Sequence, residues 1–363
     1  MNARGTWSPD ALAVRAAEAG TRADRILRAS VDDLFLPDAA RLGDRTRLTL
    51  RQMLRAMVEA IAHDLRHQVA GQVGERGAAI LTEHGRTFDR VVRAGTLRDD
   101  ALIAEVIARV RQDLIGQALP IAVGSPDIPS LLVQLATSVD AGVAQAAQTL
   151  LAADSRRRAA LEQAQMTEAD LPPALRPALV WSVAAAIRDG DDAEIDQALV
   201  AAAERRLAAP FAGDGAEDAA MALARAVDAR IAERAILLLD ALGDRRLGLF
   251  IAVIAHGLRL SFGQMRAMTL EPDGDRLWLA LRALELDRPV IAQIGLALAD
   301  ADPARDIESL ADQLDAIAAV SPAAARMALA PLALPDDFRR AIAALASASP
   351  TRPRGRDGEG AWR

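Results

Sequence analysis

The sequence contains no cysteine, no tyrosine and no lysine, and its only asparagine is Asn2. Without cysteine, the chain cannot form a disulfide, present a thiol nucleophile, or hold an Fe–S cluster or zinc ion through thiolates. Aromatic residues make up 3% of the 363 positions, whereas hydrophobic residues make up 52%. The core must therefore be built mainly from alanine and aliphatic side chains, of which alanine has the highest helix propensity.

The absence of lysine means that all 43 basic residues are arginine, and 50 acidic residues leave a net charge of −7. A protein that binds duplex nucleic acid usually has a basic surplus, and this balance gives none. Abundant arginine with scarce lysine, asparagine and tyrosine is typical of a GC-rich bacterial genome. We therefore attribute the arginines to codon bias before phosphate recognition, and we expect no nucleic-acid partner.

Long hydrophobic runs are also lacking. The first twenty residues contain no uninterrupted apolar segment of the kind found in a signal peptide. The longest apolar stretches, around 178–187 and 247–255, fall short of the ~20 residues that a membrane span needs. We expect a cytoplasmic protein without membrane insertion.

Apolar residues recur at steps of three and four between positions 45 and 73, which places them on one side of a helix. This stripe consists of Leu50, Leu54, Met57, Val58, Ile61, Leu65 and Val69. Asp44 stands directly before the segment, where a carboxylate can cap a helix. No segment shows the sustained alternation typical of strands. The sequence therefore predicts an all-α fold with a long helix over 45–73.

Proline and glycine divide the chain into four predicted parts. Further helices near 23–34, 78–94 and 97–119 complete an N-terminal helical bundle over 1–119. Three prolines and a glycine at 120–129 form a break, because they cannot lie inside a helix. Residues 130–346 are predicted to form an array of stacked helical hairpins, a HEAT-like α-solenoid of irregular period. The Pro-, Gly- and Arg-rich tail, 347–363, is predicted to be disordered.

Two groups of segments carry a resemblance to a known family. The first runs from Val31-Asp-Asp-Leu-Phe-Leu-Pro37 through Arg41-Leu42 to Ile61-Ala-His-Asp-Leu65; the second runs from Leu171-Pro-Pro and Leu179-Val-Trp181 through Leu247–Ala255 to Leu279–Leu284 and Arg288. Together they resemble the bacterial family called domain of unknown function 2336. The resemblance implies an all-helical, HEAT-like architecture, and it implies no activity, cofactor or functional residue. His63-Asp64 departs from the Arg or Ala that family members more often carry there.

The string His63-Asp64-Leu65-Arg66 is the candidate for chemistry on the long helix. Phosphoacceptor histidines of two-component systems often stand in such a string, where the neighbouring acid can orient the imidazole. His63 lies about 200° of helical rotation beyond Ile61, so it faces away from the apolar side of the long helix. The ATP-binding motifs of a histidine kinase are missing, so His63 with Asp64 would serve a passive phosphotransfer or dimerisation module. The alternative is an exposed histidine on a charged face.

The four histidines offer little for a metal site. His63 and His67 have the i, i+4 spacing of helical zinc ligands, but no third ligand is identifiable. His84 stands beside a glycine and is expected at a helix end. His256 follows an apolar run, where a helix C-terminus favours a histidine. We predict no metal ligand.

The acidic stretch 189–196 allows two interpretations. Its glycine and glutamate are misplaced for an EF-hand calcium loop. Asp192 and Asp196 could hold Mg²⁺ in an all-α enzyme of prenyl diphosphates, but a second acidic motif and an aromatic lining are missing. Otherwise these acids occupy the first turn of a helix, where its dipole favours them.

The arginine run 156–158 spreads over about 200° of a helix, so it forms no single patch and is expected on a solvated face.

Taken together, the residues favour a non-catalytic interaction or regulatory scaffold that binds a protein partner and needs no cofactor. The alternative is the phosphotransfer module that uses His63, and the third hypothesis is the magnesium enzyme. The sequence leaves the homo-oligomeric state open.

Overall fold

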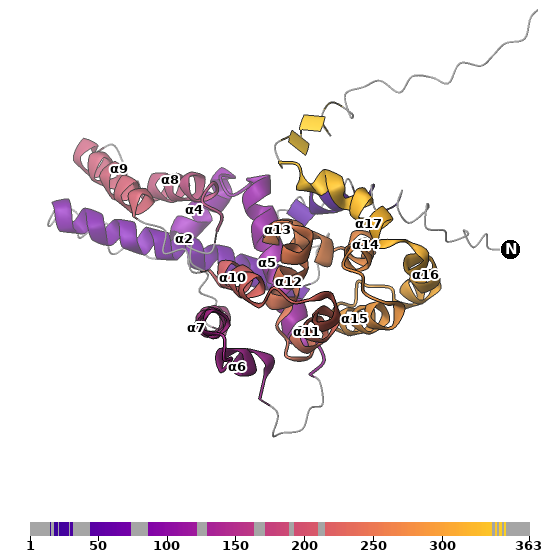
Figure 1. Ribbon diagram of the computed structural model, residues 1–363. Helices are drawn as coiled ribbons and strands as arrows, with labels where there is room; N and C mark the ends of the chain where they lie inside the picture. Colours follow the sequence, from indigo (N-terminus) through magenta and orange to yellow (C-terminus); the bar gives the residue numbers. More distant parts are fainter. Residues whose placement is uncertain are drawn as a thin grey trace, which may run out of the picture.

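A computed structural model describes residues 15, 18–20, 22–28, 30–31, 44–73, 86–121, 129–162, 171–188, 192–209, 215–335, 338–339, 341–342 and 345. These residues contain helices and turns and no strand, which confirms the all-α prediction (Figure 1). The predicted tail, 347–363, and most of the predicted break, 122–128, lie outside the described residues.

The described elements are fifteen α-helices and one short 3-10 helix. In chain order they are α2 (Asp44–Val73), α4 (Arg86–Ala94), α5 (Asp100–Ala118), α6 (Leu131–Ala136), α7 (Ala141–Glu162), α8 (Arg176–Ile187), α9 (Ala193–Ala208), α10 (Ala216–Val227), α11 (Ile231–Gly243), α12 (Leu247–Leu258), α13 (Phe262–Thr269), α14 (Asp275–Ala283), α15 (Arg288–Ala301), α16 (Ile307–Ala319), α17 (Pro322–Leu329) and η2 (Ala330–Ala333). Residues 22–28 are also helical.

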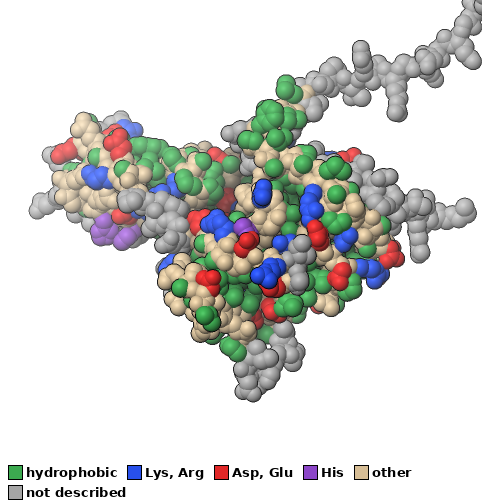
Figure 2. Space-filling model, viewed as in Figure 1, with side chains coloured by type: hydrophobic (Ala, Val, Ile, Leu, Met, Phe, Trp, Pro, Cys, Tyr) green, Lys and Arg blue, Asp and Glu red, His purple; other side chains and the backbone are tan. Residues whose placement is uncertain are grey.

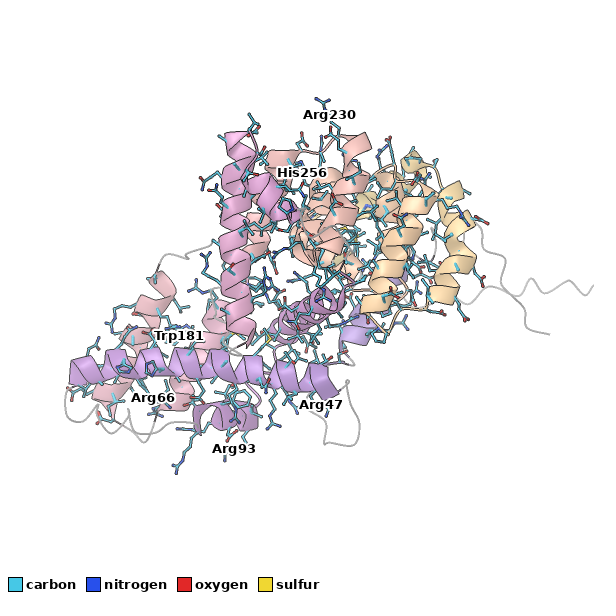
Figure 3. The ribbon with its side chains drawn as sticks, turned by 90° about the horizontal axis from the view of Figure 1, so that it is seen from below. Arg47, Arg66, Arg93, Trp181, Arg230 and His256 are labelled. Atoms are coloured by element: carbon cyan, nitrogen blue, oxygen red, sulfur yellow. The ribbon has the colours of Figure 1, made fainter. Side chains whose placement is uncertain are left out.

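The long helix predicted over 45–73 is α2, and the seven apolar residues predicted to share one side of it are all buried. α2 lies beside α8 and α9 in an arm that projects from the rest of the molecule (Figure 1). On another side it packs against α4, where the buried Arg66 donates a hydrogen bond to Thr87 Oγ1 (Figure 3). The arm is thus held together by the buried apolar residues of α2 and by the contact of Arg66 with α4.

The remaining helices form the body, with α12 near its centre (Figure 1). Seven consecutive residues of α12, Leu249–Ala255, are all buried. A helix that is hydrophobic on every side needs partners on every side, and α12 packs against α5, α10, α11, α13 and α14. This explains the short apolar run that the sequence shows at 247–255.

The hydrophobic core of the described residues consists of two clusters, and they do not divide the chain at the predicted break, 120–129. One cluster joins residues between Val31 and Val110 to residues between Leu171 and Ala203. The other joins residues between Ile115 and Ala153 to residues between Ala219 and Leu329. α5 contributes to both clusters, so it connects the arm to the body.

The order of packing also departs from a simple array. In a solenoid each helix contacts mainly its neighbours in the chain, whereas α2 packs against α8 and α9, and α5 packs against α12 and α15. Some pairs follow the chain, such as α6 with α7 and α15 with α16. The HEAT-like stacking remains a prediction.

Among the described helices, no single one is long and apolar enough to cross a membrane. Two pairs reach that length and composition together, α12 with α13 and α16 with the segment 322–333, but they are bent by 117° and 106°.

Candidate functional site

The two histidines of α2 lie on the exposed surface of the arm, with ring centroids 4.3 Å apart and an edge-on angle of 67°. The carboxylate of Asp64 points elsewhere: Oδ2 pairs with Nη1 of Arg206 from α9 and accepts a 2.9 Å hydrogen bond from Gln68. Asp64 therefore joins α2 to α9, although the phosphotransfer hypothesis assigns it to His63. That hypothesis remains a prediction.

Within the described ranges, no three His, Asp or Glu side chains come close enough together to hold a metal ion. His84 lies outside those ranges. His256 stands in the last turn of α12, where it was expected, and its Nε2 lies 2.9 Å from Asp228 Oδ1 (Figure 3).

The acids at the start of α9 have structural partners. Asp192 is the N-cap of α9 and accepts hydrogen bonds from the backbone N–H groups of Glu194 and Ile195, at 3.0 and 3.3 Å. Both carboxylate oxygens of Asp196 accept from Nε of Arg188, at 2.7 and 2.9 Å. These contacts support the helix-start interpretation of the acidic stretch; residues 189–191 lie outside the described part of the chain.

The arginine run on α7 does not lie wholly in solvent. Arg156 and Arg158 are exposed, but Arg157 points inward and places Nη2 2.8 Å from Asp113 Oδ1 on α5. The expectation of a solvated face is therefore wrong for Arg157. Its partner lies 44 positions earlier in the chain, so the local sequence could not reveal the pair.

A charged network, which we define as Glu105, Arg109, Glu217 and Arg266, connects α5, α10 and α13. Arg109 Nε lies 2.6 Å from Glu105, and its Nη2 lies 3.4 Å from Glu217. Arg266 pairs with Glu105 and with Glu217, the latter at 2.7 Å. Two cations and two anions thus alternate between three helices, with little access to water.

The carboxyl groups in this region respond differently to burial. Burial alone would raise the pKa of Glu105, but Arg266 and Arg109 hold that pKa below its ordinary value. For Asp113 and Asp154, burial prevails and raises the pKa, although Arg157 and Arg246 act in the opposite direction. Desolvation is therefore stronger at Asp113 and Asp154 than the attraction of their arginines.

Those two aspartates line a cavity of about 290 Å³ between α5, α7, α10 and the start of α12. The small side chains at Gly116, Ala220 and Gly248 leave this space between the helices. Desolvated ionisable groups around a cavity are a common property of binding sites. The sequence does not reveal this site, because its lining residues come from five separate helices and from the turn before α12.

An exposed hydrophobic surface, which we call the apolar stripe, lies beyond η2. Its members, with exposed fractions, are Leu334 (39%), Phe338 (55%), Ile342 (46%) and Leu345 (71%). Phe338, Ile342 and Leu345 are helical, and their spacing of four and three residues places them on one face. Leu334 lies in the bend that precedes them. Figure 2 shows hydrophobic side chains gathered on the segment that extends from α17. The sequence contains this spacing, but the stripe was not among the predicted sites.

Comparison with family models, with curated proteins and with solved structures gave no match.

Proposed function

We propose that this chain is a non-catalytic helical protein that binds another protein through the apolar stripe. The exposure of the stripe supports the proposal: Phe338 and Ile342 keep about half of their surface in water. Fully burying an exposed side chain of this kind contributes about 1.5–3 kcal/mol, so burying the exposed half of each contributes roughly half as much. A helix that presents apolar residues at this spacing can insert them into a hydrophobic groove.

The charge of the adjacent sequence indicates the chemistry of the partner. Residues 334–363, counted from the first residue of the stripe, contain six arginines and four acidic residues, a formal charge of +2 in a chain whose total is −7. Opposite charge at the rim of an interface steers association and fixes orientation. The partner that fits is a protein whose apolar groove has an acidic rim.

Site-specific photo-crosslinking in the native cells tests the proposal. A photoreactive phenylalanine replaces Phe338 in the full chain, and a matched variant carries it at Val139, an isolated position that is fully exposed. We expect one protein adduct from position 338 that is absent from position 139. The same adduct should disappear when Ile342→Asp is added to the position-338 variant.

The purified partner then gives the energetic test. Truncating a central aromatic anchor commonly costs 2 kcal/mol or more, so Phe338→Ala should weaken binding by about 30-fold. Equal adducts from positions 338 and 139, or no adduct, would contradict the proposal. Binding of the stripe to anionic lipid vesicles without a protein adduct would identify a membrane surface as the target and overturn it.

A further inference from the structure

The first turn of α12 lines the cavity, and its backbone N–H groups have no hydrogen-bond acceptor within the helix. The first intrahelical bond runs from Phe250 N–H to Arg246 O at 3.0 Å, so the N–H groups of Leu247, Gly248 and Leu249 have no acceptor within the helix. Arg246, the N-cap residue, makes no side-chain capping bond, and the first turn contains no acid. Leu247 and Leu249 are each 2% exposed, and all three residues line the cavity.

Two buried side chains beside this turn also have unused polar atoms. Gln112 is 5% exposed and lines the cavity, and its Oε1 has no hydrogen-bond partner. Its amide lies next to the turn, because Nε2 stands 3.7 Å from the place where a Cβ on Gly248 would be. Arg246 pairs through Nη1 with Asp154 at 2.8 Å, while its buried Nε has no partner. A side-chain amide and a guanidinium N–H therefore accompany the three backbone donors.

The size and charge of the cavity limit what can enter. Its volume of about 290 Å³ is large enough for a small molecule and not only for a single water. Four arginines and four acidic residues line it, so the formal side-chain charges cancel. What remains is the partial positive charge of the helix N-terminus, which favours an anion.

We infer that this cavity binds a small molecule through one oxyanion group, a carboxylate or a phosphate. The oxyanion accepts hydrogen bonds from the N–H groups of Leu247, Gly248 and Leu249. The side-chain amide of Gln112, which lies beside this turn, donates a further hydrogen bond to the oxyanion. The rest of the molecule lies towards Asp154, whose desolvated carboxyl group can bond its hydroxyl or amino groups.

Nuclear magnetic resonance on the full chain, labelled with ¹⁵N-glycine, tests this inference. Gly248→Ala identifies the Gly248 amide resonance by its loss; the new Cβ would make only an ordinary contact with Gln112. The probes are inorganic phosphate and acetate, with sodium chloride at matched ionic strength. We expect the Gly248 resonance to shift saturably with at least one oxyanion and not with chloride. A shift with phosphate alone or with acetate alone identifies the group that the cavity prefers.

Gly263 is the matched control, since it occupies the same second helical position in α13 as Gly248 does in α12. There a capping box uses the N–H groups of Ser261 and Gln264, and Gly263 is exposed and does not line the cavity, so its resonance should not move. Gln112→Met should weaken oxyanion binding about 3- to 10-fold, which corresponds to one hydrogen bond. An unmoved Gly248 resonance, an equal shift at Gly263, or full affinity in Gln112→Met would overturn the inference.

Discussion

Replacing Arg266 by methionine removes one cation from the charged network and keeps a long apolar side chain in its place. Arg266 is 5% exposed and bridges Glu105 on α5 to Glu217 on α10. In the variant Glu105 keeps Arg109, and Glu217 keeps Arg109 at 3.4 Å and Arg157 of α7 at 4.0 Å. Two largely buried negative charges would then share one close cation, with Arg157 as a more distant one.

The expected loss follows from the cost of leaving a buried charge without its partner. Removing one member of a buried ion pair typically destabilises a protein by about 3–5 kcal/mol. Because Arg109 still compensates part of the charge, we expect Arg266→Met to lie near the lower end, at about 3 kcal/mol. The double variant Glu105→Gln/Arg266→Met should recover part of this loss, since it removes a negative charge together with the cation.

Urea unfolding followed by circular dichroism measures the free energy of unfolding for each variant. The matched control is Arg326→Met, which breaks a 2.6 Å pair with Glu285 in which the arginine side chain is 51% exposed. Exposed pairs contribute about 0–1 kcal/mol, so the control should stay close to wild type. A loss for Arg266→Met no larger than that of Arg326→Met would refute this account of the network.

The same variant should show a distinct pH dependence. The pKa of Glu105 in the folded protein is lowered from 4.5, so its ionised form stabilises the fold above that value. This contribution is lost as the pH falls through the lower folded pKa, because a protonated Glu105 no longer attracts Arg266. The difference in unfolding free energy between wild type and Arg266→Met should therefore be largest near neutral pH and shrink below pH 4.5. If the difference in unfolding free energy between wild type and Arg266→Met grew towards acid pH, the expected direction of the pH dependence would be wrong.

Three further changes test other parts of the structure. Gly295→Ala should destabilise the body by about 1–3 kcal/mol in urea unfolding, because its Cβ would overlap the buried Leu310 side chain on α16; an unchanged midpoint would contradict this packing. Asp275→Asn should speed hydrogen exchange in the N-terminal helical segment, because Arg15 and Arg22 bond this fully buried carboxylate at 3.2 and 3.3 Å; unchanged exchange would show that other contacts anchor the segment. His63→Ala should leave crosslinking at the apolar stripe unchanged, and phosphohistidine at His63 after incubation with acetyl phosphate would favour the phosphotransfer hypothesis instead.

Elements whose cause is local were predictable from the sequence. The apolar spacing between positions 45 and 73 predicts α2, which the structure places at Asp44–Val73. Asp192 at a helix start and His256 at a helix end also lie where the helix dipole favours their charges. In these cases the determining residues are a few positions apart, so one sequence contains the necessary information.

The candidate site depends on contacts between distant parts of the chain. Glu105 and Arg266 are 161 positions apart, and neither belongs to a motif that would distinguish it from other charged helix residues. Attributing the arginines to codon bias gave no reason to expect any of them in the interior, yet Arg109 and Arg266 are buried. The cavity was equally hidden, because glycines such as Gly116 and Gly248 show their effect only when two helices meet.

The alternation of the chain between the two hydrophobic clusters has a consequence for its synthesis. α2 and α5 are made early, but α8 and α9, which complete the hydrophobic cluster of the arm, come later. Ninety residues separate the end of α5 at Ala118 from the end of α9 at Ala208. At the usual ~5–20 residues per second of translation, the apolar face of α2 remains incompletely covered for about 5–20 s. During that interval the nascent chain presents a long hydrophobic helix to the cell, which is the kind of surface that ribosome-associated chaperones bind.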